Sequence, residues 1–395
     1  MKPSNRLVRI ALVTLAALLG ACGGGGGGGS TDSGTMRLAL TDAPACGYDH
    51  VYVTVQKVRV HKSSTAADTD ADWSEVTVNP AQRVDLLGLT NGVLAELGQT
   101  ALPAGKYTQM RLVLAANDAT NPLANAVTPT GAAEVALSTP SAVQSGLKMN
   151  IDIDVAADKV ADFVLDFDAC KSVVRLGQSG NYNLKPVVAV IPRLSDAGAR
   201  VVGYVAPAIA LSTTSVSVQL AGVRVRSTPP DSTGKFVLYP VPAGTYDLVV
   251  SAAGRVTATI TGVPVVTTAP TTVNTTGAAI DPPTSTVRTA SGAVATGATP
   301  IDASVDVIKK YSGGPNVVVA SAPVDGTTGV YTFGLVSGAA VKTAYVANAA
   351  SLAFTADTTV PTGKYTLTAT SGATSKSVDI DVTGANVSGA NFTFP

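Results

Sequence analysis

The sequence is poor in charge and in aromatic side chains. Only 14% of its 395 residues are charged, 27 basic and 27 acidic side chains cancel, and aromatic residues make up 5%. A chain without excess positive charge lacks the attraction for phosphate backbones, so nucleic acid is not an expected partner. Valine, threonine, alanine and glycine dominate instead, which favours strands and tight turns. We therefore predict an all-β fold of tandem β-sandwich domains.

Reactive side chains are also scarce. Two histidines occur, His50 and His61, and the sequence contains no Gly-x-Ser-x-Gly, Cys-x-x-Cys or His-Glu-x-x-His motif. Ser145 and Lys148 have the Ser-x-x-Lys spacing, but the following residues alternate as in a strand, where side chains three apart face opposite sides. We predict that the chain is not an enzyme, with a hydrolase as the minor alternative.

The N-terminus has the pattern of a lipoprotein signal. Basic residues precede a short apolar run over residues 10–19, and the small pair Gly20-Ala21 leads to Cys22. The run is too short to span a bilayer. We predict a signal peptide over residues 1–21, lipidation of Cys22 and a flexible Gly/Ser tether over residues 22–35. Gly23 and Gly24 replace the aspartate that retains many lipoproteins at the inner membrane, so the expected location is the outer membrane of a Gram-negative bacterium.

Two further cysteines, Cys46 and Cys170, form an even pair in a compartment where disulfides persist. Each follows or precedes a predicted strand, so we expect a disulfide between strand ends. Closing so long a loop stabilises by about 4 to 5 kcal/mol in the chain-entropy model. Two buried free thiols are the alternative.

Period-two alternation and turn residues divide the chain into three strand-rich units. We predict domains over residues 36–195, 200–280 and 286–395, with one short helix over residues 93–97. A turn of the form Pro-x-Gly-x-Tyr occurs once in each unit and precedes an alternating strand. Proline and glycine set the turn and tyrosine anchors the strand, so a structural role is expected for the repeat. The tyrosines are Tyr107, Tyr246 and Tyr365.

Three segments resemble known families. Residues 36–192 resemble the DUF4382 family of bacterial lipoproteins through several motifs in order, among them Leu40-Thr41-Asp42-Ala43-Pro44, Val84-Asp85-Leu86-Leu87 and Leu165-Asp166-Phe167-Asp168. Residues 201–279 resemble carboxypeptidase regulatory-like, or transthyretin-like, β-sandwich domains through Gly234-Lys235-Phe236-Val237-Leu238 and the following Pro-x-Gly-x-Tyr turn, and residues 287–394 are similar to a degenerate relative. The resemblance implies a cell-envelope location, a β-rich fold and no catalytic residue.

Three alternating carboxylates, Asp68, Asp70 and Asp72, have the spacing of a calcium loop. The glycine that such a loop needs at its sixth position is Trp73, and the bidentate glutamate at its twelfth is Asn79. A solvated hairpin tip between two strands is the alternative. The sequence therefore predicts no cofactor, with calcium as the minor possibility.

Four other carboxylates share strand faces through period-two spacing. Asp152 and Asp154 lie on one predicted strand, and Asp166 and Asp168 lie at the end of another. If these strands are neighbours, the four would form an acidic cluster able to hold a cation or to perform acid–base chemistry. The alternative is a polar outer face opposite apolar core residues.

The single tryptophan, Trp73, is the one indole side chain available for stacking against a sugar. Beside Tyr48, Tyr52 and Tyr107 it would form a small sugar-stacking platform, whereas core packing is the alternative. We predict a non-enzymatic cell-envelope lipoprotein with a structural, adhesive or ligand-presenting role. Its partners would be the membrane, through the N-terminal lipid, and an envelope protein or glycan. A carbohydrate-binding surface module is the second hypothesis, prompted by the starch-binding-like topology that the carboxypeptidase regulatory-like resemblance implies.

Overall fold

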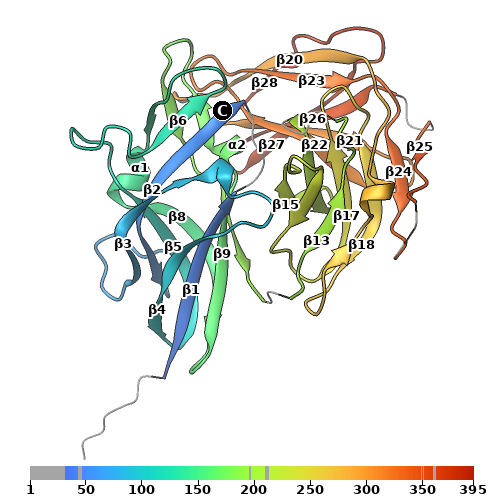
Figure 1. Ribbon diagram of the computed structural model, residues 1–395. Coiled ribbons are helices and arrows are strands. Elements are labelled where there is room, and N and C mark those ends of the chain that lie inside the picture. The colour runs from blue at the N-terminus through green and yellow to red at the C-terminus, as the bar shows by residue number, and fades with distance from the viewer. Residues whose placement is uncertain are drawn as a thin grey trace, which may run out of the picture. The chain divides into compact units, whose positions relative to one another are not determined.

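The computed structural model is built almost entirely from strands, which confirms the predicted all-β fold of tandem sandwiches (Figure 1). Strands account for 54% of the structure and helices for 4%. The structure describes residues 32–42, 47–194, 197–209, 213–347, 349, 351–358 and 362–395. Cys22, Cys46 and the predicted signal peptide therefore lie outside the described residues.

The first module, residues 33–192, contains two sheets. One has the order β12-β9-β1-β4, and the other has the order β10-β11-β7-β6-β2-β5-β8 with β3 paired to β2. The strands of the first sheet are β1 (Ser33–Asp42), β4 (Ala95–Pro103), β9 (Val160–Phe167) and β12 (Val188–Pro192). Those of the second sheet are β2 (Tyr48–His61), β3 (Ser74–Asp85), β5 (Gly105–Leu114), β6 (Ala126–Pro129), β7 (Val135–Ser138), β8 (Leu147–Val155), β10 (Val173–Arg175) and β11 (Tyr182–Leu184). Three short helices complete the module: η1 (Leu86–Gly88), α1 (Pro140–Gln144) and α2 (Ala169–Ser172).

The second module, residues 201–280, is a two-sheet sandwich. Its small sheet has the order β16-β13-β19, and its larger sheet begins β15-β14-β17-β18. The strands are β13 (Val201–Tyr204), β16 (Lys235–Leu238), β19 (Thr271–Thr272), β14 (Ser215–Leu220), β15 (Val223–Thr228), β17 (Gly244–Ser251) and β18 (Ala258–Val265), followed by η3 (Thr276–Ala278). Its apolar core is separate from that of the first module.

The third module, residues 287–336 and 362–395, has sheets of order β23-β20-β28 and β22-β21-β26-β27. Its strands are β20 (Val287–Ala295), β23 (Val330–Val336), β28 (Phe392–Thr393), β21 (Ser304–Lys310), β22 (Asn316–Pro323), β26 (Lys364–Ser371) and β27 (Thr374–Asp381). The two sheets enclose a core of their own. Each module thus buries its own apolar side chains, as a sandwich domain does.

The predicted boundaries need two corrections. The segment of β24 (Val341–Ala344) and β25 (Thr355–Ala356), assigned to the third unit by sequence, joins the large sheet of the second module instead. β24 runs parallel to β18, and Val341 is buried in the second core. The tether also ends earlier than predicted, because β1 begins at Ser33.

A bulge in β2 keeps its valines in the core. Val51, Val53 and Val55 alternate inward, and after Gln56 the inward positions shift to Val58 and Val60. The register shifts between Val55 and Lys57 against both β3 and β5, which leaves Gln56 unpaired. One extra residue changes which side chains face inward, so the bulge reconciles this sequence with one continuous strand.

The Pro-x-Gly-x-Tyr repeat has the structural role predicted from sequence. The hydroxyl of Tyr107 donates to the Pro103 carbonyl at 2.9 Å, and that of Tyr246 donates to the Pro242 carbonyl at 2.8 Å. In the third copy, Tyr365 donates to the Val336 carbonyl at 2.8 Å. Each ring is buried. In the first two copies the hydroxyl ties the turn to the strand that follows it, whereas in the third it joins β26 to the end of β23.

Tyr246→Phe is expected to lower the free energy of unfolding by about 1 kcal/mol, because the half-buried Pro242 carbonyl loses its donor while the ring packing is retained. Tyr345→Phe is the control, since its hydroxyl bonds to none of the described residues. Urea denaturation of the three proteins measures the difference. Equal midpoints for Tyr246→Phe and Tyr345→Phe would contradict the assigned role.

Candidate functional site

A group of charged side chains in the first module surrounds the loop between β2 and β3. Arg59 on β2 lies opposite Arg111 on β5 and opposite Glu75 on β3. Like charges directly opposite each other destabilise a sheet. Glu75 lies 3.0 Å from Arg59 Nε and is shared with Lys57 Nζ at 3.0 Å. A second counter-charge is therefore needed between the two arginines.

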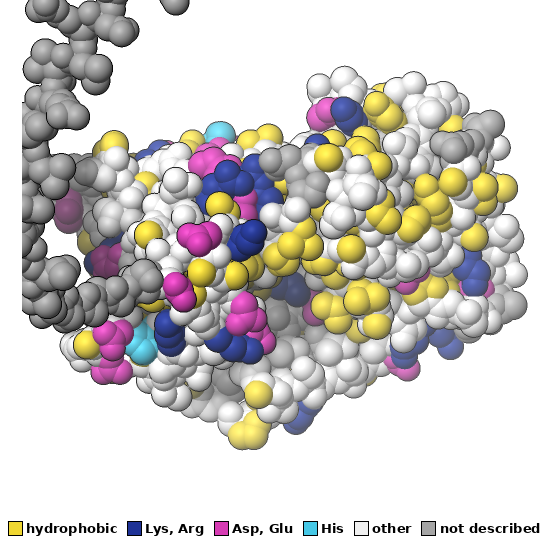
Figure 2. Space-filling view, turned by 90° about the horizontal axis from the view of Figure 1, so that it is seen from below, with side chains coloured by type: hydrophobic (Ala, Val, Ile, Leu, Met, Phe, Trp, Pro, Cys, Tyr) yellow, Lys and Arg dark blue, Asp and Glu magenta, His cyan; other side chains and the backbone are white. Residues whose placement is uncertain are grey.

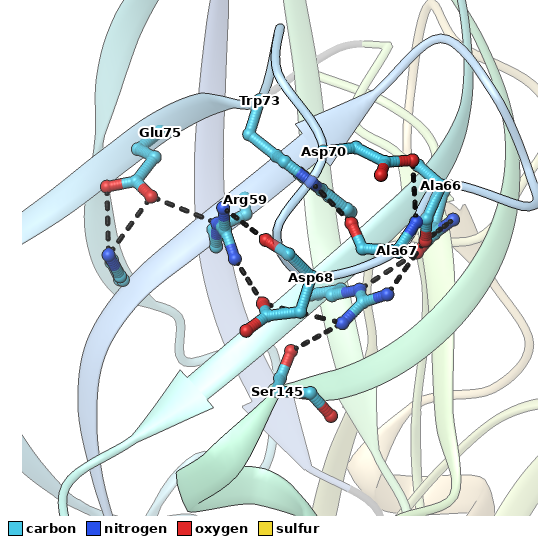
Figure 3. Close-up of polar contacts among 11 residues, drawn as sticks. Arg59, Ala66, Ala67, Asp68, Asp70, Trp73, Glu75 and Ser145 are labelled. Carbon is cyan, nitrogen blue, oxygen red and sulfur yellow. Dashed lines mark hydrogen bonds and ion pairs between the residues drawn. The ribbon is translucent and has the colours of Figure 1, made fainter.

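Asp68 from the loop supplies that counter-charge (Figure 3). Its carboxylate accepts a short hydrogen bond from Arg59 Nη1 and lies 3.6 Å from Arg111 Nη1. The Trp73 ring lies 4.6 Å from the Arg59 guanidinium and 4.9 Å from that of Arg111, and its indole N–H donates to the Ala67 carbonyl at 3.0 Å. We call Arg59, Asp68, Trp73, Glu75 and Arg111 the Trp73 cluster. It fastens the loop onto the sheet through charge and cation–π contacts.

Arg111 is the most enclosed member of the cluster, with its side chain 7% exposed. Its three nitrogens donate to the Gln109 side chain at 2.8 Å, the Ser145 carbonyl at 3.0 Å and the Ala66 carbonyl at 2.9 Å. Ser145 thus contributes its carbonyl, and β8 begins two residues later at Leu147. The strand that was predicted after Ser145 is confirmed.

The three loop carboxylates are not gathered around one point. Asp68 is engaged by arginine, Asp70 accepts from the Ala67 backbone N–H at 2.9 Å, and Asp72 is exposed with φ at +68°. Within the described part of the chain, no three His, Cys, Asp or Glu side chains form a group suited to a metal. Calcium stays the minor alternative to the predicted absence of a cofactor, and a thermal-shift measurement tests it, because a bound ion raises the melting temperature.

Asp68→Asn is expected to lower the free energy of unfolding by about 2 kcal/mol, because it leaves two opposed guanidinium groups without their shared carboxylate. Asp72→Asn removes the same charge from the same loop without touching an arginine, and asparagine tolerates the positive φ. Urea unfolding measures both variants. If Asp68 is the shared counter-charge of the two arginines, Asp68→Asn must be less stable than Asp72→Asn. Equal free energies of unfolding would contradict that role.

The possible acidic cluster of Asp152, Asp154, Asp166 and Asp168 does not form, because its two strands lie in different sheets. β8 carries Asp152 and Asp154 to the exposed face of the large sheet, where Asp152 pairs with Lys106 at 2.7 Å. β9 carries Asp166 into a different environment, and Asp168 accepts from the Lys171 backbone N–H at 3.0 Å as the N-cap of α2. The alternative interpretation of β8 is confirmed, since Ile153 between the two aspartates is buried.

Asp166 forms a buried ion pair with Arg226 of β15. The Arg226 side chain is 1% exposed and that of Asp166 is 11% exposed. Arg226 also donates to the Thr41 hydroxyl at 2.6 Å and to the Tyr239 carbonyl at 3.1 Å. Burial raises the pKa of Asp166, and the neighbouring guanidinium opposes that rise. The sequence did not single out Arg226, because arginines alternating with valines in β15 resemble a solvated strand face.

Cys170 lies in α2 and is not a free thiol. Its predicted partner, Cys46, falls outside the described residues, so the Cys46–Cys170 disulfide stays a prediction. The backbone around both positions supports it. β1 and β9 are parallel and in register to their last residues, with Asp42 opposite Phe167, and the Asp42 carboxylate accepts from the Ala169 backbone N–H at 3.0 Å.

The aromatic platform that the sequence left open beside core packing does not assemble around Trp73, whose side chain is half-buried. Its aromatic neighbour is His61, with ring centroids 5.1 Å apart, whereas Tyr48 contacts Tyr182. Tyr107 is 2% exposed. Trp73 instead covers two arginines, which sequence analysis did not select. The one signal for them is Arg111, because it interrupts an otherwise apolar strand, Met110 to Leu114.

Residues 33–186 match the family model described as a domain of unknown function, DUF4382, in agreement with the resemblance seen in the sequence. No curated protein matches the chain. Among the described residues, no helix is long and apolar enough to cross a membrane.

Some solved structures show weak similarity. A chain from a type II cohesin–X-dockerin complex of Acetivibrio cellulolyticus is 28% identical over 21% of this chain and 56% of that one, with a TM-score of 0.18. The Bacillus anthracis TIE protein is 11% identical over 92% and 51%, with a TM-score of 0.17. The major pilin subunit BcpA of Bacillus cereus is 13% identical over 91% and 99%, with a TM-score of 0.14. The chain covers about half the length of the first two. Such TM-scores support no argument about function.

Proposed function

We propose that this chain is a non-enzymatic lipoprotein of the cell envelope, anchored through lipid on Cys22, with a structural, adhesive or ligand-presenting role. The proposed location is the outer membrane of a Gram-negative bacterium. The observation that carries the proposal is the position of β1. This strand begins at Ser33, within the last residues of the predicted tether, and is paired on both sides, with β4 on one edge and β9 on the other.

This position suits a chain that is held from its N-terminus. β1 forms eight register pairs with β4 and eight with β9. Tension on the tether pulls along β1, so its extraction requires hydrogen bonds on both edges to break. Arg37 on β1 also forms an ion pair with Asp162 on β9. The predicted anchoring segment therefore continues into an inner strand of the first sheet and not into an edge strand.

The remaining modules support a spacer or presentation role. Each encloses its own apolar core, and the sandwich over residues 201–280 is compatible with the carboxypeptidase regulatory-like resemblance, which brings no catalytic residue. Two carboxylates considered as candidates for acid–base chemistry form structural contacts instead: Asp166 pairs with Arg226, and Asp168 is the N-cap of α2. These contacts favour a surface-presenting protein over a hydrolase.

Lipidation and location are tested together. The precursor is expressed in a Gram-negative host with an alkyne-tagged fatty acid, as wild type, as Cys22→Ala and as Ser30→Ala, which changes the tether but keeps the cysteine. We expect label and outer-membrane density for wild type and Ser30→Ala, and neither for Cys22→Ala. An unlabelled wild-type protein would overturn the anchor, and a labelled protein in the inner membrane would overturn the location.

The role is tested by cross-linking in intact cells followed by mass spectrometry. A structural or adhesive protein is expected to yield reproducible envelope partners with wild type and to lose them with Cys22→Ala, which no longer reaches the membrane. Turnover of a small substrate by the purified chain would argue for the enzymatic alternative.

A further inference from the structure

The first module carries a groove of about 790 Å³ on the exposed side of its large sheet. Thr54 and Gln56 of β2, Ala81 and Arg83 of β3 and the segment of residues 115–124 line it, together with Glu134 before β7. This volume falls within the range of small-molecule sites. None of the candidate residues considered above lines it.

The bulge in β2 places Gln56 in this groove. Gln56 has no register partner in β3 or β5, is exposed, and contributes to the lining. Bulges redirect a side chain away from the regular ladder and are frequent beside binding sites. The same irregularity that keeps the valines inward therefore presents an amide side chain outward.

The wall opposite β3 is held in place without a ligand. The Ala115 backbone N–H donates to the Thr54 carbonyl at 2.8 Å, and the Thr54 hydroxyl donates to the Ala124 carbonyl at 2.5 Å. Asp118 accepts from the backbone N–H groups of Thr120 and Asn121, both at 2.8 Å. A wall fixed in this way loses little conformational freedom on binding, which favours affinity.

The charged side chains that line the groove already have partners among neighbouring residues. Arg83 lies 3.7 Å from the Tyr52 ring, forms an ion pair with Glu134 and donates to the Leu123 carbonyl at 3.2 Å. Asp118 is occupied by its own turn. The lining therefore has no excess positive charge with which to hold an anion, which favours a neutral ligand.

The uncommitted polar groups are two amides and a hydroxyl. The side chains of Gln56, Thr120 and Asn121 form no hydrogen bond with any described residue. Amides and hydroxyls both donate and accept, so they match a ligand rich in hydroxyl groups. Between them lie small apolar surfaces, including Ala81 and Leu123, which is 38% exposed. Such surfaces suit the C–H face of a sugar ring.

We propose that this groove binds a neutral saccharide. Gln56, Thr120 and Asn121 contact its hydroxyl groups, and Ala81 and Leu123 contact its apolar face. The proposal adds a binding activity to the presenting role and does not depend on the lipid anchor. An extended peptide is the competing occupant, but the uncommitted polar groups identified in the lining are side chains.

The test uses the full chain with Cys22→Ala, so that binding is separated from lipidation. Isothermal titration is carried out with cellohexaose, maltohexaose, xylohexaose and chitohexaose, and with an unrelated hexapeptide. We expect at least one sugar to bind and Gln56→Ala and Asn121→Ala each to weaken it about tenfold. Gln82→Ala, an exposed amide on β3 that does not line the groove, should bind as wild type.

Ala116→Trp fills the groove without removing a polar group, and it should abolish binding while keeping the melting temperature. If Gln56→Ala does not fold, Ala116→Trp still tests whether the sugar binds in the groove. The proposal is overturned if no sugar binds, if the hexapeptide binds instead, or if sugar binding survives Ala116→Trp and Asn121→Ala. Because lipidation is absent throughout, none of these outcomes bears on the proposed anchor.

Discussion

Replacing Cys46 or Cys170 with serine is expected to lower the free energy of unfolding by about 4 to 5 kcal/mol, the chain-entropy value for a disulfide that closes a loop of this length. The register of the first sheet supplies the physical reason. Asp42 and Phe167 are the last paired residues of parallel strands, and the two cysteines follow them by four and three residues along the chain. Stretches of this length that start from adjacent points are long enough for two cysteine side chains to meet, which is why we predict the bond.

Urea denaturation with and without reductant measures this effect. Reduction should destabilise wild type by as much as Cys170→Ser does, and it should leave Cys170→Ser unchanged. Cys22→Ala is the matched control, since it removes a cysteine without affecting the pair. Two thiols accessible to alkylation in unfolded, unreduced protein would contradict the disulfide and support the free-thiol alternative.

Arg226→Met is expected to cost about 3 to 5 kcal/mol, because it leaves the Asp166 carboxylate buried without a counter-charge. Replacing both partners removes that problem. The double variant Arg226→Met with Asp166→Leu should therefore be closer to wild type than the single variant is. A double variant as unstable as Arg226→Met would show that the loss comes from other contacts of Arg226, such as its bond to Thr41.

The same variant should acquire a pH dependence. Burial raises the pKa of Asp166, and Arg226 is the charge that opposes the rise. Without Arg226 the folded-state pKa rises further above the unfolded value, so the folded state binds more protons between the two values and its stability falls as the pH increases. Arg226→Met should therefore lose less stability at pH 5 than at pH 8. Equal losses at both pH values would contradict a charged, buried Asp166.

Much of the fold follows from the period of the sequence, and the exception is instructive. Alternation predicted the strands of β2, β8 and β9, and all three form. The short helix expected over residues 93–97 is wrong, because β4 begins at Ala95 and pairs with Leu40 of β1. A short apolar run does not distinguish helix from strand, and a distant partner strand decides the outcome.

The site was less predictable, for a physical reason. Period-two spacing states which residues share a face, but not which strands become neighbours. Asp152 and Asp154 therefore share a face as expected, yet Asp166 belongs to another sheet. The arginines escaped notice because a charged residue in an alternating strand resembles a solvated one. Arg111 and Arg226 are both buried, and only the partners brought by the fold reveal it.

The parallel pairing of β24 with β18 makes the second module dependent on residues that are synthesised much later. Until residue 344 has emerged, the edge of β18 that receives β24 has no partner, and an open edge of this kind is prone to pair with other chains. During synthesis the second module is thus a nearly complete sandwich in which one edge of β18 still lacks its partner strand. A chain truncated before β24 should therefore aggregate more readily than the full chain.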